Sequence, residues 1–457
     1  MTATDQPTPP ATNAGGLDDR CAKPGRLTWL SMVLDMPVAS DPDAVLEHIG
    51  PGADLIVPLA NGEPVTLLDT IESHGDELDG VRVHQMHAVH DRPYLHGAFG
   101  DRLRHVSYFL SHVTRPCFQA GTIDLVPNNF SEMWAILAER TVDPLVIASA
   151  SPPDRHGYFS LGLSADYVSS FIGRARFFLE ANAQMPRTFG RNQVHVSQAL
   201  GWVEVDRPLL EVPPPSRSAI DDRIAAFVAE RIPNGATIQT GIGSIPNAIL
   251  SALSDHRDLG VHTELLSDGL MDLVDAGVVN GMAKQLNRTK SVGTFALGTR
   301  RLYDFLDENA AFELLPVRYV NDPRVIAQED GFVSINSTIA VDLFGQCASE
   351  TIGGSYYSSS GGQADFARGA MYSKGGLGFV VLASTAKQET ISKIVARLSA
   401  GDVVTTLKNT VDKVVTEWGV AELRGRSLRQ RAEALIAIAH PAHRDRLRAE
   451  ALAIGHS

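Results

Sequence analysis

The sequence contains few cysteines. There are 3 among 457 residues, Cys21, Cys117 and Cys347, and they lie far apart. This spacing excludes a zinc motif built on paired cysteines and a disulfide-stapled small domain, and it is typical of proteins in a reducing compartment. No His-Glu-x-x-His helix is present either. We therefore expect a cytoplasmic protein without a bound metal.

Long apolar runs and a basic excess are also missing. No run of about 18 apolar residues occurs, so no membrane span is predicted. The formal net charge of -13 argues against a nucleic-acid partner, because such partners require a basic stripe. Residues 1–26 lack the basic start and apolar core of a secretory signal, and we expect a flexible N-terminal tail. The charge still allows a small anionic ligand, since a few backbone amides suffice locally.

The length and the hydrophobic pattern predict more than one α/β domain. A chain of 457 residues exceeds one ordinary core. Short apolar runs such as 54–59 and 144–148 alternate with helical patterns such as 130–140, which favours buried parallel strands. The prolines at 213–215 interrupt this alternation, because they fit neither a helix interior nor a central strand. We expect a domain over 27–205, a proline-rich linker over 206–217 and a second domain over 218–457.

A glutamate stands near the end of a strand-like run in the second domain. The run covers residues 259–266, contains Glu264, and is followed by a turn-and-helix pattern. Ligands of open α/β sheets bind outside the carboxyl ends of the strands. Glu264 is therefore the candidate catalytic carboxylate, and a solvated strand end is the alternative. With an ordinary pKa of about 4.3 it would be ionised at neutral pH.

A glycine loop precedes this glutamate. A strand-like run at 237–239 leads into Gly241-Ile242-Gly243-Ser244-Ile245, and Pro246 lies in the first turn of the following helix. Strand, tight turn and helix N-terminus together direct backbone N–H groups at an anion. A dinucleotide fingerprint would carry glycine where Pro246 stands, so a nicotinamide-dependent dehydrogenase is a weaker alternative. The other alternative is an ordinary turn that binds no ligand.

Three further positions have both a functional and a structural interpretation. The small residues of 358–370 predict a loop, which is either a flexible surface loop or one whose backbone comes close to a ligand. Asn336 lies in a strand-like run, where asparagine is disfavoured, so it either occupies an edge position, which we favour, or orients another group. His156, in a proline-rich turn, is more often a hydrogen-bonded structural residue than a base.

Taken together, these segments resemble the acetyl-CoA hydrolase/transferase family, the class I CoA-transferases. The likeness runs from about residue 27 to the C-terminus. It is carried by Ser151–Tyr158, Met185–Thr188, Gly241–Pro246, His262–Glu264, Gly361–Phe366 and Val414–Ala421. The resemblance implies two similar open-sheet α/β domains with the active site in the cleft between them.

The resemblance also implies roles for single residues. Glu264 matches the family's nucleophile, Gly241, Ile242, Gly243, Ser244 and Ile245 match the CoA-binding loop, and Gly362 matches a second CoA contact. Asn336 resembles a catalytic position near the carboxylate, and Lys387 resembles a CoA-contacting lysine. No permanently bound cofactor is implied, since coenzyme A is a substrate, and a homodimer is expected by analogy.

The implied reaction moves CoA between a short-chain acyl-CoA and a carboxylic acid such as acetate, butyrate or 4-hydroxybutyrate. It passes through a glutamyl-CoA thioester, which is covalent catalysis. The alternatives are an acetyl-CoA hydrolase that uses the same glutamate, and a non-catalytic acyl-CoA-binding module. Thr122, Ala183-Gln184 and Phe189 depart from the family pattern in the first domain, which leaves the acyl preference and the balance between transfer and hydrolysis open.

Overall fold

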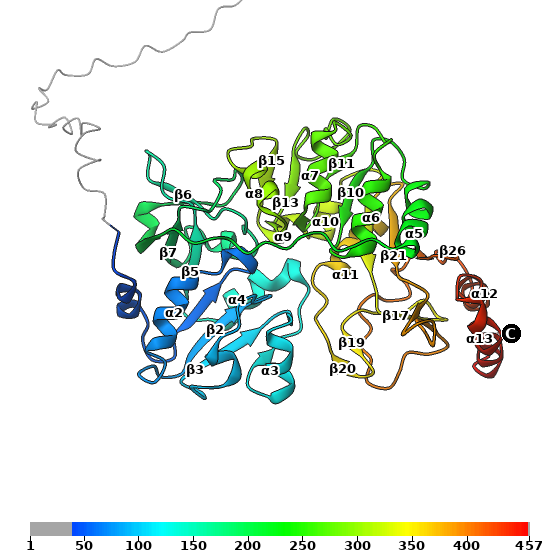
Figure 1. The fold of residues 1–457 in the computed structure, drawn as a ribbon, viewed down its shortest axis with the longest axis horizontal. Coiled ribbons are helices and arrows are strands. Elements are labelled where there is room, and N and C mark those ends of the chain that lie inside the picture. Colours follow the sequence, from blue (N-terminus) through cyan, green and yellow to red (C-terminus); the bar gives the residue numbers. More distant parts are fainter. Residues whose placement is uncertain (1–38, 456–457) are drawn as a thin grey trace, which may run out of the picture. The chain divides into compact units, whose positions relative to one another are not determined.

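The computed structural model describes residues 39–455. The predicted tail over 1–26 lies outside these residues. Two sheets of mainly parallel strands organise the described chain, one in each half of the sequence (Figure 1). The α/β fold predicted from the alternating pattern is therefore confirmed.

The first sheet has seven parallel strands in the order β4-β3-β2-β1-β5-β7-β9. All six residues of β5 are buried, as expected for a parallel strand covered on both faces. Its strands are β1 (Asp54–Val57), β2 (Val81–Gln85), β3 (Leu103–Ser107), β4 (Asp124–Leu125), β5 (Leu145–Ala150), β7 (Arg176–Asn182) and β9 (Ala199–Val205). Helices α2 (Val65–Ser73), α3 (Thr114–Ala120) and α4 (Met133–Arg140), 3-10 turns such as η4 (Phe130–Glu132), and the ribbon of β6 (Tyr158–Ser160) and β8 (Gln193–His195) complete this half.

The second sheet has six strands in the order β11-β10-β16-β21-β25-β26, and only the β25–β26 pair is antiparallel. Its strands are β10 (Thr237–Thr240), β11 (Gly260–Val261), β16 (Val333–Ser337), β21 (Leu377–Val381), β25 (Lys413–Thr416) and β26 (Gly419–Glu422). The helices are α5 (Ala219–Ala229), α6 (Ser244–Ala252), α7 (Asp268–Asp275), α8 (Arg300–Leu306), α9 (Val317–Val320), α10 (Pro323–Ile326), α11 (Gln363–Tyr372), α12 (Leu428–Ala437) and α13 (Pro441–Ala453).

Short strand pairs surround this second sheet. Parallel pairs join β12 (Leu265–Leu266) to β14 (Phe295–Ala296) and β13 (Ser291–Gly293) to β15 (Phe312–Leu314). The other short strands are β17 (Ala340–Asp342) with β18 (Cys347–Ala348) and β24 (Ile394–Val395), β19 (Thr351–Ile352) with β20 (Ser355–Tyr356), and β22 (Thr385–Ala386) with β23 (Ile391–Ser392).

The strand predicted over residues 259–266 is divided in two around Glu264. The chain leaves β10 after Val261 and pairs with β14 from Leu265 onward. Between the two strands, the Thr263 N–H donates to Val292 O at 3.0 Å. The Glu264 carbonyl accepts from the N–H groups of Thr294 at 3.0 Å and Phe295 at 3.2 Å. Glu264 therefore lies where the strand changes partners, with its backbone fixed on both sides.

Two sequence-based predictions are wrong. The loop predicted over 358–370 ends at Gly362, because helix α11 begins at Gln363 and buries Phe366 and Ala370 on one face, four residues apart. The edge position that we favoured for Asn336 is also wrong, because its strand β16 lies inside the sheet between β10 and β21. Asparagine is tolerated in this strand since its amide is hydrogen bonded there, as described below.

The segment over 206–217 joins the two sheets without regular secondary structure. It contacts residues of both halves: the Leu210 N–H donates to Asn61 Oδ1 at 2.8 Å, and the Val212 N–H donates to Gly298 O at 2.8 Å. By their internal contacts, the described residues 39–455 belong to one compact unit. The division into two domains at this segment therefore stays a prediction, although β9 ends and α5 begins on either side of it.

Candidate active site

The Glu264 carboxylate receives hydrogen bonds from two separate elements. Asn321 follows α9 directly, and its Nδ2 donates to Glu264 Oε2 at 2.7 Å. The backbone N–H of Gly362, the N-cap of α11, also donates to the carboxylate. Only glycine fits here, because a Cβ at position 362 would lie 2.0 Å from Glu264 Oε2 and 2.3 Å from Asn321 Nδ2. A strand end and two helix termini thus converge on one side chain.

Burial raises the pKa of Glu264 to about 7, while the hydrogen bonds from Asn321 and Gly362 act in the opposite direction. Burial has this effect because the ionised form loses hydration. The expectation of an ordinary pKa is therefore wrong. Burial likewise raises the pKa of Asp365, in the first turn of α11, to about 7, with the Glu264 charge adding to the shift and hydrogen bonds from Ser131 opposing it. The two carboxyl groups are electrostatically coupled, so their titrations are linked.

A small apolar cavity of about 50 Å³ opens beside Glu264. The N-terminal half supplies Leu59, Met86, His87, Phe109 and Phe130, and the C-terminal half supplies Ile242, Phe295 and Leu297. Glu264 retains partial solvent exposure, and it faces this cavity. The carboxylate is therefore accessible from a mostly apolar space to which both halves of the chain contribute.

The glycine loop reaches the same cavity. Ile242 is 60% exposed and lines both the Glu264 cavity and a second cavity of about 60 Å³ beside Gly241, Gly243 and the prolines 213–215. Gly243 has φ 130°, a conformation that glycine adopts readily. The Gly241 N–H is already used, since it donates to Ile335 O at 3.1 Å. Within the first turn of α6, Pro246 has no N–H and the Asn247 N–H donates to Gly243 O at 3.1 Å. The helix-start donors left for an anion are therefore the N–H groups of Ser244 and Ile245.

The structure places Asn336 and Lys387 away from the Glu264 carboxylate contacts. The Asn336 amide exchanges hydrogen bonds with Gln239, at 3.2 Å in each direction, and donates to Ser334 Oγ at 3.1 Å. It therefore orients the strand that leads into the glycine loop. Lys387 is exposed, with φ 47°, in the turn between β22 and β23. A catalytic role for Asn336 and a CoA contact for Lys387 stay predictions.

Asn321 is a site residue that the sequence reasoning missed. It lies 57 residues from Glu264 along the chain, and no glycine run or strand pattern surrounds it. An asparagine just after a short helix reads as an ordinary C-terminal cap. Its side-chain Oδ1 is buried and has no hydrogen-bond partner among the described residues. No hydrogen bond at Oδ1 therefore competes with the one from Nδ2 to Glu264.

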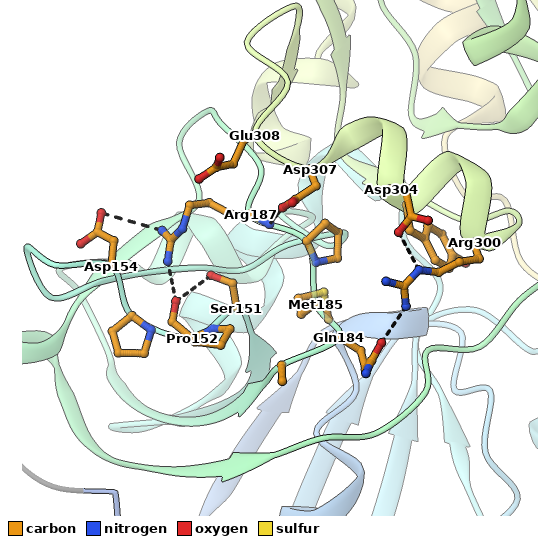
Figure 2. Close-up of a pocket in the computed structure, with 14 residues that line it drawn as sticks. Ser151, Pro152, Asp154, Gln184, Met185, Arg187, Arg300, Asp304, Asp307 and Glu308 are labelled. Atoms are coloured by element: carbon orange, nitrogen blue, oxygen red, sulfur yellow. Dashed lines mark hydrogen bonds and ion pairs between the residues drawn. The ribbon is translucent and has the colours of Figure 1, made fainter.

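A larger cavity of about 490 Å³ lies elsewhere, lined by two of the sequence motifs (Figure 2). Its arginines are engaged: Arg300 Nε donates to Asp304 at 2.6 Å and Arg300 Nη1 to Gln184 at 2.7 Å, and Arg187 Nη2 donates to Pro152 O. His156 is exposed beside this region, where its Nε2 accepts from Arg155 Nε at 3.0 Å. These motif residues hold turns together, and Glu264 does not line their cavity.

Among residues 39–455, no group of three or more His, Cys, Asp and Glu side chains is arranged to hold a metal ion. Over the same range, none of the helices combines the length and the apolar character needed to cross a membrane. Cys117 and Cys347 are buried free thiols.

Fold and site together define a two-sheet α/β protein with a partly buried carboxyl group facing an apolar cavity. Residues 39–213 match the model of the acetyl-CoA hydrolase/transferase N-terminal domain, and residues 298–451 match that of the C-terminal domain. The chain belongs to the acetyl-CoA hydrolase/transferase family. The resemblance inferred from the sequence motifs is confirmed.

Named relatives cover most of the chain. A succinyl-CoA:cyclohexane-1-carboxylate CoA transferase of Geobacter metallireducens is 44% identical over 398 residues, which is 87% of this chain and 91% of the relative. A 4-hydroxybutyrate coenzyme A transferase of Clostridium kluyveri is 42% identical over 390 residues, 85% of this chain and 91% of the relative. The crystal structure of RipA from Yersinia pestis superimposes with a TM-score of 0.87 at 37% identity, covering 92% of this chain and 98% of that one.

Proposed function

We propose that this protein is a CoA-transferase that moves CoA between a short-chain acyl-CoA and a carboxylic acid through a thioester on Glu264. The observation that carries the proposal is the Glu264 carboxylate, held by Asn321 and Gly362 and facing an apolar cavity that the glycine loop also lines. The names of the relatives, which are CoA transferases, support the same reaction class. The segment with Glu264 lies between the two matched domains, so its role rests on geometry.

The reaction starts with attack of a Glu264 oxygen on the thioester carbonyl. Asn321 donates to Oε2, and a Cβ built on Gly362 would also meet Oε2 first, so we assign Oε1 as the attacking atom. The C–S bond breaks, CoA leaves as a thiolate, and an acyl-glutamyl anhydride remains. The thiolate then attacks the glutamyl carbonyl carbon, and the C–O bond breaks to release the first acid. The resulting glutamyl-CoA thioester reacts with the second acid by the reverse steps.

Two sets of donors serve the two kinds of tetrahedral intermediate. During attack on the glutamyl carbon, negative charge develops on Oε2, to which the Asn321 amide already donates, and the Gly362 N–H donates to the same carboxyl group. For attack on the acyl carbon, the proposed donors are the N–H groups of Ser244 and Ile245 at the start of α6, next to Ile242, which lines the Glu264 cavity. One such donor typically contributes about 3 kcal/mol to the transition state. Because these donors are in place beforehand, little reorganisation is needed during the reaction.

Exchange kinetics test the proposed function directly. With acetyl-CoA and labelled acetate we expect label to enter acetyl-CoA, and with a second acid we expect the ping-pong pattern of parallel double-reciprocal lines. The non-catalytic binding alternative predicts saturable CoA binding without exchange. The hydrolase alternative predicts steady release of free CoA at the same rate whether or not an acid is present. Either of these results would contradict the transferase proposal.

The pH profile of transfer is expected to follow the raised pKa of Glu264. Only the ionised carboxylate attacks, so kcat/KM for the acyl-CoA should be level above about pH 7 and fall about tenfold per pH unit below it. The hydrogen bond from Asn321 lowers this pKa, so in Asn321→Ala the midpoint should move to higher pH and the plateau should drop about 100-fold. The measurement is kcat/KM for acetyl-CoA from pH 5 to 9.

Asn280→Ala is the matched control for this profile, because Asn280 is exposed, its amide bonds Asp258, and it neither bonds Glu264 nor lines the cavity beside it. Its midpoint and plateau should equal those of the unchanged protein. A profile that is flat between pH 5 and 8 would remove the link between Glu264 ionisation and the reaction.

A further inference from the structure

The cavity beside Glu264 has a lining that determines which acyl tails fit. Seven of its side chains are hydrocarbon or thioether groups, and apart from Glu264 the one polar member is His87. Among the residues that the structure describes, no lysine or arginine lines this cavity. A carboxylate at the far end of an acyl tail would therefore lose its hydration without gaining a cation, which is strongly unfavourable.

The cavity is also small. A volume of about 50 Å³ corresponds to about four water-sized groups, at 10–15 Å³ for each. An acetyl, propionyl or butyryl tail places at most three carbons beyond the thioester carbonyl, and this fits the space. A hexanoyl tail exceeds it, unless the side chains of Met86 or Phe109 move.

His87 occupies a constrained position in this lining. Its φ of 55° lies in the left-handed region, and its backbone N–H donates to Phe109 O at 3.3 Å. The imidazole packs against the Phe109 ring with the centroids 5.5 Å apart. Burial lowers the pKa of His87 to about 4, with the charge of His112 acting in the same direction and Glu63 acting against it. The ring is therefore uncharged at neutral pH, and it offers hydrogen bonding without a positive charge.

We infer that the Glu264 cavity selects acyl groups with uncharged tails of up to about four non-hydrogen atoms, and that the absence of a cation at position 87 rejects tails ending in a carboxylate. This inference rests on the proposed function, since the cavity selects acyl groups only if Glu264 is the acylated residue. By this inference, dicarboxylic thioesters such as succinyl-CoA are poor donors for this protein, although three relatives carry succinyl-CoA in their names. His87 is here a specificity-determining residue of the cavity.

The test compares CoA thioesters as donors with acetate as the common acceptor. With the unchanged protein, kcat/KM for succinyl-CoA should be at least about 100-fold below that for butyryl-CoA, and hexanoyl-CoA should be poorer than butyryl-CoA. His87→Arg should raise the ratio of succinyl-CoA to butyryl-CoA activity at least about tenfold, because a guanidinium then faces the tail. Phe109 also lines the cavity, and its ring packs against the imidazole of His87. Phe109→Arg should therefore raise the same ratio if the first variant folds poorly.

Two control variants separate charge from other effects. His87→Asn keeps a residue that tolerates a positive φ and adds no charge, so the ratio should stay low. His96→Arg adds a cation on the same half of the chain, at an exposed histidine that contacts Asp91, and should leave the ratio unchanged. An increase in either control would overturn the role of charge at position 87.

Failure of this inference is distinguishable from failure of the proposed function. If the unchanged protein transfers CoA from succinyl-CoA as well as from butyryl-CoA, or if both folded arginine variants keep the original ratio, the inference is overturned while the transferase reaction stands. If no thioester of the panel supports transfer to acetate, the proposed function itself is contradicted.

Discussion

Replacing Glu264 by alanine should lower the rate of CoA transfer by at least about 10⁴-fold, because no covalent intermediate can form without the carboxylate. Glu264→Asp keeps a carboxyl group one methylene shorter, which moves the attacking oxygen away from its donors, and should cost at least about 100-fold. The intermediate itself provides the second measurement. After incubation with acetyl-CoA alone, mass spectrometry should find CoA attached to the peptide that contains Glu264 in the unchanged protein and no such adduct in the alanine variant.

Glu77→Ala is the control for this experiment, because Glu77 is an exposed glutamate on the N-terminal half. Its transfer rate and its adduct should equal those of the unchanged protein. Transfer at a normal rate by a folded Glu264→Ala protein, or an adduct on another acidic residue, would place the chemistry elsewhere.

Gly362→Ala should lower kcat/KM for acyl-CoA by at least about 100-fold, the effect of losing one preorganised donor. The added methyl group would overlap Glu264 Oε2 and Asn321 Nδ2, at 2.0 and 2.3 Å from the new Cβ, so the carboxylate and the amide must separate. The backbone itself accepts alanine, since φ is -94°. The free energy of unfolding should therefore fall by less than about 3 kcal/mol, and denaturant unfolding alongside kinetics would separate the two effects.

Gly50→Ala offers a matched control, because a Cβ at Gly50 meets nothing within 4 Å. Both its activity and its unfolding free energy should stay close to those of the unchanged protein. Full activity of Gly362→Ala would mean that the contact of Gly362 with the carboxylate is dispensable.

The sequence predicts the sheets and the position of the candidate glutamate better than it predicts the surroundings of that glutamate. Buried parallel strands are continuous apolar runs, so β1 and β5 could be located from composition alone. The glycine-rich turn into α6 follows from local rules for strand-to-helix connections. Glu264 could be singled out because its run ends at a turn, and the carboxyl end of a strand is where α/β sheets bind ligands.

The rest depends on contacts between distant segments, which local patterns do not contain. Asn321 joins Glu264 only through the fold, and the cavity combines side chains from both halves of the chain. The helix at Gln363 was missed because small residues weaken the helical pattern, whereas packing of Phe366 in the core stabilises it. The sequence favours an edge for Asn336 because asparagine is disfavoured in strands, and the partner that satisfies its amide inside the sheet, Gln239, lies 97 residues away. The raised pKa of Glu264 depends on burial, which composition does not reveal.

The burial that raises the pKa of Glu264 has a consequence for the resting form of the protein. An ionised carboxylate is poorly solvated at this position, whereas the anhydride and the thioester of the same side chain carry no charge there. Under the proposed reaction, forming the thioester relieves an unfavourable charge, so the environment of Glu264 would favour the CoA-loaded side chain over the bare carboxylate. If that reaction holds, a cell that supplies acyl-CoA faster than acceptor acid would keep most of this protein in the loaded form.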